Sequence, residues 1–202
     1  LVALSSYGLV GLDRDNPIAS EAAMKYFVLG AIASGLLLYG MSMLYGSTGS
    51  LQLDTIYVAA TQTSSPYMFK LGVVFILAGI AFKLGAAPFH MWLPDVYQGA
   101  PTAVTAFISS APKLAAFAMA YRLLESAAGV AASDWVPMLA VIATLSLLLG
   151  NLMALVQSNF KRLLAYSTIS HVGFLLLGML TATPEGYAAS MFYAISYSIM
   201  AV

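Results

Sequence analysis

The sequence predicts an all-α fold, a polytopic transmembrane helix bundle that contains one broken helix. The chain has 202 residues, of which 61% are hydrophobic and only 8% charged, whereas about 25% are charged in an average soluble domain. Several continuous apolar runs reach the ~20 residues that a helix needs to cross a bilayer, and they lack the alternation of a β-barrel. One run is interrupted at residues 82–101 by a lysine, a histidine, an aspartate and three prolines, which indicates a break within a crossing.

Composition also limits the partners and cofactors of the chain. Its net charge is zero and it has no basic block, so we expect the lipid bilayer, and no nucleic acid, as a partner. It has no cysteine, which excludes disulfides, iron–sulfur clusters and thiolate metal sites within these residues. No signal-peptide pattern opens the chain, which starts without methionine and ends inside an apolar run. We therefore expect a fragment of a longer protein.

About seven spans are predicted, the first and last of them partial. Residues 1–12 resemble the end of a span, and a polar loop follows. Proline is tolerated at the first position of a helix, so the second span is expected from Pro17 to about Tyr45. Residues 46–66 are rich in Gly, Ser, Thr and Gln and predict an exposed loop, with a short surface helix at residues 51–60.

The third span is expected at residues 67–87, because Pro88 removes a backbone hydrogen-bond donor there. Pro94, Gly99 and Pro101 then prevent a long regular helix. The remaining predicted spans are residues 102–124, 135–156 and 163–181, followed by the start of a seventh near Tyr187.

The charges of the loops predict on which side of the membrane each loop lies, because cytoplasmic loops of membrane proteins favour Lys and Arg. If residues 88–101 complete the third crossing, the loop containing Arg14 and the basic pair that begins at Lys161 lie on one side of the membrane. The loops at residues 46–66 and 182–186, which have no Lys or Arg, then lie on the other side. This pattern favours a broken helix within one crossing.

Most charged side chains lie near span ends, where the membrane surface accounts for them. Lys113 is different, because it lies roughly 18 Å along the fourth span. A lysine at such a depth costs about 2.5–3.5 kcal/mol on insertion scales, and such residues are usually functional. The alternative is a buried ion pair or a contact with a backbone carbonyl, which Pro112 beside it could free one turn back.

Lys83 lies near the end of the third span, just before Pro88. A helix that breaks there leaves unpaired carbonyls with partial negative charge, which favour a nearby lysine. Broken helices at membrane depth also mark ion and substrate sites in transporters. Lys83 is therefore a candidate functional residue.

Two histidines and one more lysine complete the candidates. His90 follows the break, and His171 lies within the sixth span. Histidine titrates near physiological pH and suits a relay between buried lysines, although either residue could simply make a hydrogen bond between helices. Lys25 lies four residues after Glu21, so a surface ion pair could explain it. No nucleophile–base set or cofactor motif accompanies these residues, and together they predict a proton path through a helical bundle.

Three stretches of the sequence carry a resemblance to a known family. They are residues 82–102 (FKLGAAPFHMWLPDVYQGAPT), residues 20–27 (SEAAMKYF), and residues 150–155 (GNLMAL) with residues 161–171 (KRLLAYSTISH). They resemble the antiporter-like membrane subunits of respiratory complex I, most closely the subunit N family of bacterial NADH–quinone oxidoreductases. The resemblance covers all 202 residues, which would form a single antiporter-like transmembrane domain, residues 1–202.

The resemblance implies a proton-translocating membrane subunit of a translocase, NADH:quinone oxidoreductase, in the bacterial inner (cytoplasmic) membrane. Proton movement would be coupled to NADH oxidation and quinone reduction in other subunits. NADH, FMN, iron–sulfur clusters and quinone are then expected in those subunits, with no cofactor and no metal in this chain. The expected partners are the other membrane subunits of complex I, including neighbouring antiporter-like subunits.

The resemblance also implies roles for individual residues. Lys83 would be the lysine of the family's broken helix, His90 the relay histidine beyond the break, and Lys113 the lysine of the next helix. Lys25 and His171 would be a lysine and a histidine of two further helices, and both would take part in proton transfer. The family's glutamate partner of the broken-helix lysine would fall before the first residue, and its last relay lysine after the last residue.

Three alternatives remain open. A subunit of a multi-subunit cation/proton antiporter would share the fold. A haem-binding redox subunit would use His90 and His171 as axial ligands. A purely structural spacer would leave the charges without a role, which the cost of burying Lys113 opposes.

Overall fold

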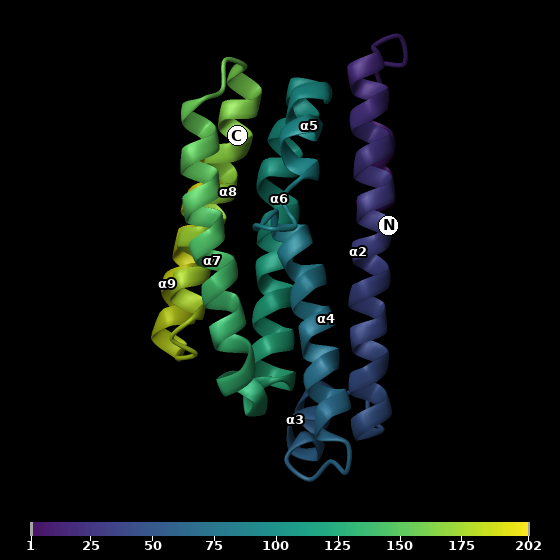
Figure 1. Cartoon of the computed structure of the whole chain (residues 1–202), viewed down its shortest axis with the longest axis vertical. Helices are drawn as coiled ribbons and strands as arrows, with labels where there is room; N and C mark the ends of the chain where they lie inside the picture. Colours follow the sequence, from purple (N-terminus) through teal and green to yellow (C-terminus); the bar gives the residue numbers. More distant parts are fainter. Residues whose placement is uncertain (1, 202) are drawn as a thin grey trace.

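The computed structural model describes residues 2–201 as a bundle of long helices standing side by side (Figure 1). Over these residues no strand is present, in agreement with the predicted all-α class. A π-helical turn at Arg122–Ala127 and a 3-10 turn at Gly129–Ala131 join the sixth helix to the seventh. The α-helices in chain order are α1 (Val2–Val10), α2 (Pro17–Thr48), α3 (Leu53–Ala60), α4 (Pro66–Leu84), α5 (Trp92–Gly99), α6 (Thr102–Tyr121), α7 (Ala132–Leu155), α8 (Phe160–Met179) and α9 (Pro184–Met200).

Five helical segments of the described chain are long and apolar enough to cross a membrane. They are α2, α4, α6 with its π-helical turn, α7 with its 3-10 turn, and α8. The predicted partial spans at the two ends are the shorter helices α1 and α9, and the expected surface helix is α3. At 8 residues, α5 is too short to cross a bilayer alone.

Capping residues determine where several helices begin and end. Asn16 caps the start of α2, and Asn159 caps the start of α8 by accepting hydrogen bonds from backbone N–H groups of the first turn. For this reason α8 begins at Phe160, slightly before the predicted start. The α2 helix continues past the predicted end at Tyr45 to Thr48, where Gly49 adopts the left-handed conformation with φ 71° and its N–H bonds back to the carbonyl of Tyr45.

The predicted break lies between α4 and α5. The α4 helix ends at Leu84 because Gly85 adopts the left-handed conformation that favours glycine, with φ 79°. The N–H groups of Gly85 and Ala86 bond back to carbonyls of the last turn of α4, a Schellman ending. Residues 85–91 contain turns, and α5 starts at Trp92. In Figure 1, α5 continues from α4 toward the other end of the bundle, as one broken crossing requires.

Small residues bring α2 and α4 close together. A Cβ atom on Gly40 of α2 would lie 2.6 Å from the backbone oxygen of Gly72 on α4, so only glycine permits this approach. Because lipid tails are as apolar as leucine, close packing and not exclusion of water holds such helices together. The α2 helix therefore lies firmly against the first half of the broken crossing.

Large buried side chains fill the spaces on the other faces of the broken crossing. One cluster joins α4, α6, α7 and α8, and its fully buried members include Ile80, Phe117 and Trp135. A second cluster joins α2, α5 and α8, where Trp92 stacks on Tyr26 with ring centroids 4.6 Å apart. Both halves of the broken crossing therefore pack against α2, and each half also belongs to a separate buried cluster.

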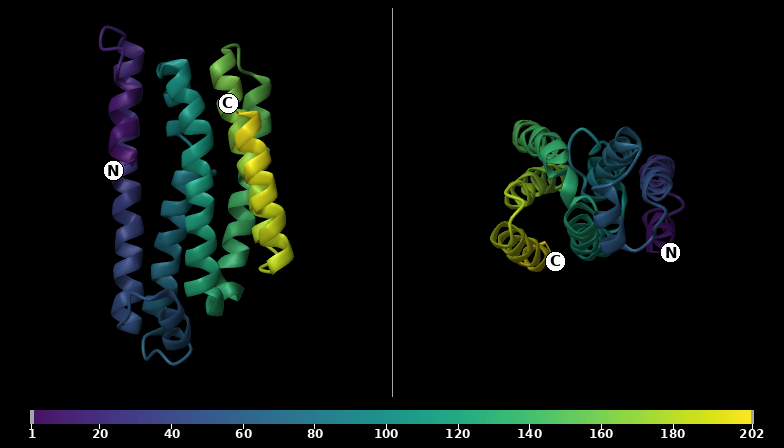
Figure 2. Two further views of the ribbon diagram at one scale, coloured as in Figure 1. Left: turned by 180° about the vertical axis from the view of Figure 1, so that it is seen from behind. Right: turned by 90° about the horizontal axis from the view of Figure 1, so that it is seen from below.

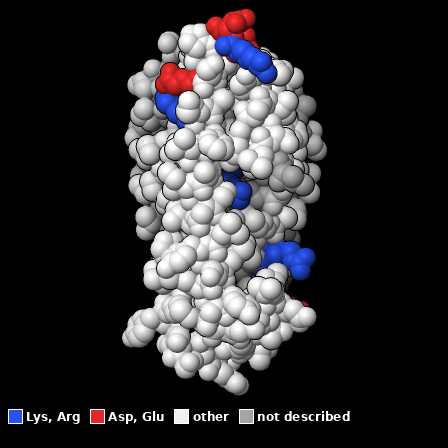
Figure 3. Space-filling view, turned by 90° about the vertical axis from the view of Figure 1, so that its right-hand side faces the viewer, with Lys and Arg blue, Asp and Glu red and all other residues white. Residues whose placement is uncertain are grey.

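The loops lie on the sides that the charge pattern predicts. In Figure 1, the turn after α1 and the turn before α8 lie at the upper end of the bundle, while the loops around α3 and before α9 lie at the lower end. Figure 3 shows acidic and basic groups at the upper end of one face, a small basic patch near its middle and a further basic group lower down, on an otherwise uncharged surface. A largely uncharged surface with charged groups concentrated at its end is expected of a bilayer-spanning bundle.

Candidate functional site

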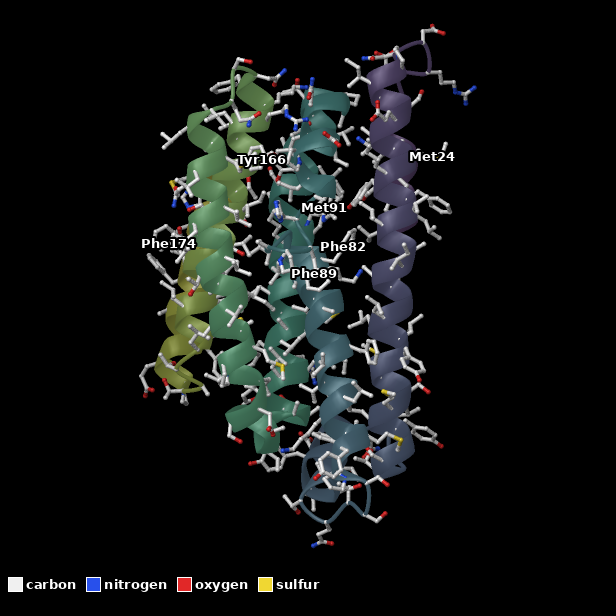
Figure 4. The ribbon with its side chains drawn as sticks, in the orientation of Figure 1. Met24, Phe82, Phe89, Met91, Tyr166 and Phe174 are labelled. Atoms are coloured by element: carbon white, nitrogen blue, oxygen red, sulfur yellow. The ribbon has the colours of Figure 1, made fainter. Side chains whose placement is uncertain are left out.

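The break between α4 and α5 is the centre of the candidate site, because side chains of neighbouring helices satisfy its backbone groups. In a continuous helix the carbonyl of Leu84 would accept a hydrogen bond from the residue four positions later. That residue is Pro88, which has no N–H group. The Nζ atom of Lys113, on α6, donates to this carbonyl instead, at 2.6 Å. Figure 4 shows Phe82, Phe89 and Met91 around the break at mid-height of the bundle.

Lys113 is deeply buried, with 5% of its surface exposed. The sequence therefore located a buried lysine correctly, and it also named a backbone carbonyl as one possible partner. The acceptor, however, is a carbonyl of α4 and not the one that Pro112 frees on its own helix. The reason is geometric, since Gly85 has no side chain and a Cβ atom there would lie 3.4 Å from the Lys113 Nζ atom.

Two further side chains form hydrogen bonds with backbone groups at the break, and sequence reasoning named neither. Ser146 of α7 is fully buried, and its hydroxyl accepts a hydrogen bond of 2.8 Å from the backbone N–H of Ala87. Trp92 Nε1 donates to the carbonyl of Phe82 at 3.1 Å. The available signal was a single serine in the middle of the apolar run of α7, since a hydroxyl at that depth needs a partner.

Lys83 lies one residue before the end of α4 and is half-buried. Its ammonium group makes no ion pair or side-chain hydrogen bond with the described residues. Lys83 lies in the last turn of α4, at the negative end of the helix dipole, as the sequence predicted. Lys83 and Lys113 therefore both lie at the break, but only Lys113 is bonded to it.

His90 lies within the break, in the last turn before α5, and is half-buried. Its carbonyl accepts a hydrogen bond of 3.0 Å from the N–H of Leu93. Its Nδ1 atom is buried and has no hydrogen-bond partner among residues 2–201. No direct hydrogen bond joins it to Lys83 or Lys113 in the described chain, so a relay through His90 needs a bridging water.

His171 of α8 lies near Lys113, which the sequence could not show. Its Nδ1 atom is 2.7 Å from the hydroxyl of Tyr193 on α9. Lys113, His171 and Tyr197 line a shared cavity of about 10 Å³, roughly the room that one water molecule needs. One water there could connect the lysine with the histidine.

Lys25 of α2 lies in an ion-pair network near the upper end of the bundle. Its ammonium group is 2.7 Å from Glu21, which confirms the predicted pair, and also 2.7 Å from Asp95 of α5. The other carboxylate oxygen of Asp95 accepts a hydrogen bond of 2.6 Å from Arg162 of α8. Asp95 thus joins three helices, a role that sequence reasoning did not identify for it or for Arg162. The Lys25 side chain remains 43% exposed, so its charge is partly solvated.

The predicted residues therefore form two groups. Lys113 and His171 share a cavity, with Lys83 and His90 at the adjacent break, whereas Lys25 belongs to the separate network around Asp95. The part of the chain that the structure describes contains no group of three or more His, Cys, Asp or Glu residues able to hold a metal ion. The chemistry open to the first group is transfer of protons between amines, imidazoles, hydroxyls and water.

Comparisons with known proteins bear on this arrangement. A curated relative, NADH-quinone oxidoreductase subunit N of Xanthomonas euvesicatoria pv. vesicatoria (strain 85-10), is 60% identical over 200 residues, which are 99% of this chain and 41% of the relative. The relative from Laribacter hongkongensis (strain HLHK9), also subunit N, is 59% identical and covers 100% of this chain and 42% of the relative. The chain therefore spans about two-fifths of the length of these relatives.

Solved structures show the same fold. A chain of respiratory complex I from Thermus thermophilus with bound aureothin matches with a TM-score of 0.82 at 38% identity, covering 99% of this chain and 42% of that one. A chain of the Mrp complex from Dietzia sp. DQ12-45-1b matches with a TM-score of 0.87 at 26% identity, covering 98% and 37%. The sequence itself matches the family described as NADH:quinone oxidoreductase/Mrp antiporter, TM, over residues 1–202. This chain belongs to the NADH:quinone oxidoreductase/Mrp antiporter transmembrane family.

Proposed function

We propose that the chain is part of a proton-translocating membrane subunit of NADH–quinone oxidoreductase, respiratory complex I. Its protons would move through the residues at the break, driven by NADH oxidation and quinone reduction in other subunits. The observation that carries this proposal is the hydrogen bond from the buried Lys113 to the Leu84 carbonyl. The identity of 59–60% to proteins named subunit N supports the choice of complex.

Lys113 suits proton transfer because its partner is a dipole and not a charge. A buried lysine paired with a carboxylate cannot lose its proton without leaving an uncompensated buried anion. The partner of Lys113 is the neutral carbonyl of Leu84, so loss of the proton leaves both groups neutral. Loss of the proton from Lys113 therefore leaves no buried charge without a partner.

The proposed sequence of transfers follows the geometry. Lys83 and His90 lie at the break, and water in the break would connect them to Lys113. A water in the shared cavity would then take a proton from Lys113 and deliver one to His171. Imidazole can accept a proton at one ring nitrogen and release one from the other. We propose Lys83, His90, Lys113, His171 and Lys25 as the proton-transfer residues, with Lys25 acting from the Asp95 network at the upper end.

The surroundings of the subunit follow from the same proposal. The chain would lie in the bacterial inner (cytoplasmic) membrane beside other membrane subunits of the complex, including antiporter-like ones. Its cofactors, namely NADH, FMN, iron–sulfur clusters and quinone, would be bound by other subunits. The curated relatives are bacterial proteins named as subunits of this oxidoreductase, and the five membrane-length helices fit this location. We also propose that residues 1–202 form a single antiporter-like domain.

A second candidate function is that of a subunit in a multi-subunit cation/proton antiporter. The TM-score of 0.87 to a chain of an Mrp complex favours it. The higher sequence identity to subunit N proteins favours the first proposal.

Proton uptake by membrane vesicles tests both proposals. Vesicles whose complex carries Lys83→Ala or Lys113→Ala should take up fewer protons per electron when NADH is oxidised. Undiminished uptake at normal electron flow would contradict the first proposal. Sodium-dependent proton transport without NADH oxidation would establish the second.

A further inference from the structure

A cavity of about 250 Å³ lies between α2, α5 and α8, near the upper end of the bundle (Figure 1). Lys25 lies directly beside it, since its ammonium group pairs with the carboxylates of Glu21 and Asp95. Two negative and two positive side chains therefore meet here, and their charges sum to zero. The lining combines two carboxylates, a guanidinium and an amide with a small apolar part, namely Glu21, Asp95, Arg162, Gln98, Ile18 and Ala22.

The charged groups lie at the depth of the lipid headgroups. The α2 helix has 32 residues and is therefore about 48 Å long, slightly more than the ~40–45 Å of a bilayer with its headgroup layers. Glu21 follows the start of α2 at Pro17 by four residues, which corresponds to about 6 Å along the axis. Each headgroup layer is about 5–7 Å thick by the same dimensions. Glu21 is therefore placed within that layer.

Below this polar end, the same face of α2 is apolar. Glu21, Val28 and Ile32 are separated by seven and four residues, so they lie on one side of the helix. Val28 and Ile32 are 45% and 57% exposed, and α1 and α2 form one edge of the bundle in both views of Figure 2. The α1 helix packs against a different side of α2, where the ring centroids of Tyr7 and Tyr26 lie 4.6 Å apart. The exposed face thus has charged groups above an apolar part, as a phospholipid has.

The polar groups retain hydrogen-bonding capacity beyond their contacts with one another. The Glu21 side chain is 64% exposed, and a carboxylate has about four acceptor positions. Its bond of 2.7 Å to Lys25 therefore leaves acceptors for a second ammonium group. The Gln98 side-chain carbonyl accepts a hydrogen bond of 3.1 Å from Arg162, and the Gln98 amide N–H groups make no hydrogen bond with the described residues. An anion in the cavity would give these donors an acceptor.

We propose that the cavity and the α2 face below it bind a zwitterionic phospholipid with a primary ammonium group, of the phosphatidylethanolamine type. Its ammonium group would pair with Glu21, and its phosphate would accept hydrogen bonds from Gln98 and Arg162. Its acyl chains would lie along Val28 and Ile32. A headgroup with one charge of each sign complements a site whose own charges sum to zero. Such a site is independent of the proposed proton transfer and adds a lipid partner to it.

The chemistry of the headgroup determines the expected specificity. A primary ammonium group donates three hydrogen bonds, as that of lysine does, whereas the quaternary ammonium group of phosphatidylcholine has no N–H to donate. Phosphatidylglycerol carries only a negative charge, so it would meet the carboxylates of Glu21 and Asp95 without a cation of its own. We therefore expect phosphatidylethanolamine to bind most tightly of the three.

The test uses the purified intact complex, stripped of lipid in detergent and titrated with these three lipids, all with identical acyl chains. Native mass spectrometry counts the lipids bound to each complex. Glu21→Gln should weaken the binding of one phosphatidylethanolamine molecule several-fold and leave phosphatidylcholine binding unchanged. Lys25 keeps its bond to Asp95 in this variant. Glu185→Gln is the matched control, because Glu185 is an exposed glutamate in the first turn of α9, away from the cavity.

Equal binding of phosphatidylethanolamine and phosphatidylcholine by the unaltered complex would overturn the proposed site. The same loss of phosphatidylethanolamine in Glu21→Gln and Glu185→Gln would also overturn it. A density map of the intact complex in lipid gives an independent check. A headgroup in the cavity with chains along α2 supports the site, whereas another polypeptide segment filling the cavity contradicts it.

Discussion

The Nζ atom of Lys113 lies 2.6 Å from the carbonyl oxygen of Leu84, the last residue of α4 before the break. This contact exists because Pro88 cannot supply the N–H group that would occupy the carbonyl in a regular helix. The break and the buried lysine are therefore one unit and not two separate features. Any change in the geometry of the break changes the partner of the lysine, so under the proposed function the break would control proton transfer.

Gly85→Ala should destabilise the break. A left-handed residue other than glycine costs about 1–3 kcal/mol, and the new Cβ atom would also meet the Leu93 side chain. We expect the purified complex to lose thermal stability and to pump less per electron. Gly35→Ala is the control, since that glycine has open space around it. An unchanged melting temperature for Gly85→Ala would show that the left-handed turn is not required.

Ser146→Ala should leave the N–H of Ala87 without an acceptor. An unpaired buried group costs about 1–3 kcal/mol, so the free energy of unfolding should fall by that order. Ser110→Ala is the control, because the Ser110 hydroxyl bonds only within its own helix, to Ala106 and Phe107. Equal stabilities of the two variants, measured by thermal unfolding, would exclude Ser146 as a support of the break.

Asp95→Asn should loosen α5 from α2 and α8, because the carboxylate pairs with Lys25 and Arg162 together. Partly exposed ion pairs contribute little each, so we expect a loss of about 1 kcal/mol for the two. The loss should shrink at high salt, since salt screens such pairs. Asp134→Asn, which breaks the single pair with Lys70 at 2.9 Å, should cost less. A larger loss for Asp134→Asn would contradict the bridging role of Asp95.

Much of the fold could be predicted from the sequence, because helix-length apolar runs and proline breaks are local signals. The all-α class, the surface helix at Leu53–Ala60 and the single broken crossing all follow from such signals. Helix ends were predicted less well, since α2 extends to Thr48 and ends at the left-handed Gly49. Periodicity and hydropathy do not show which of the nearby glycines, Gly46 or Gly49, ends the helix.

The site was predictable as a set of residues but not as an arrangement. Burial of Lys113 follows from its place in an apolar run, and the Lys25 pair with Glu21 follows from spacing along one helix. The contact of Lys113 with Leu84 and the position of Asp95 between two helices depend on tertiary packing between distant segments. A single sequence does not state which helices are neighbours. The roles assigned to the five candidate residues remain predictions.

The most direct test of the proton-transfer role uses Lys113→Arg in the intact complex. Arginine keeps a positive charge and can donate to the Leu84 carbonyl, but it cannot release its proton at physiological pH. The substitution therefore separates the structural contact from proton transfer, and Lys70→Arg at the membrane surface is the matched control. The quantity to measure is proton uptake per electron during NADH oxidation in sealed vesicles. We expect a marked loss for Lys113→Arg and none for Lys70→Arg, whereas full proton uptake per electron in Lys113→Arg would contradict transfer through Lys113.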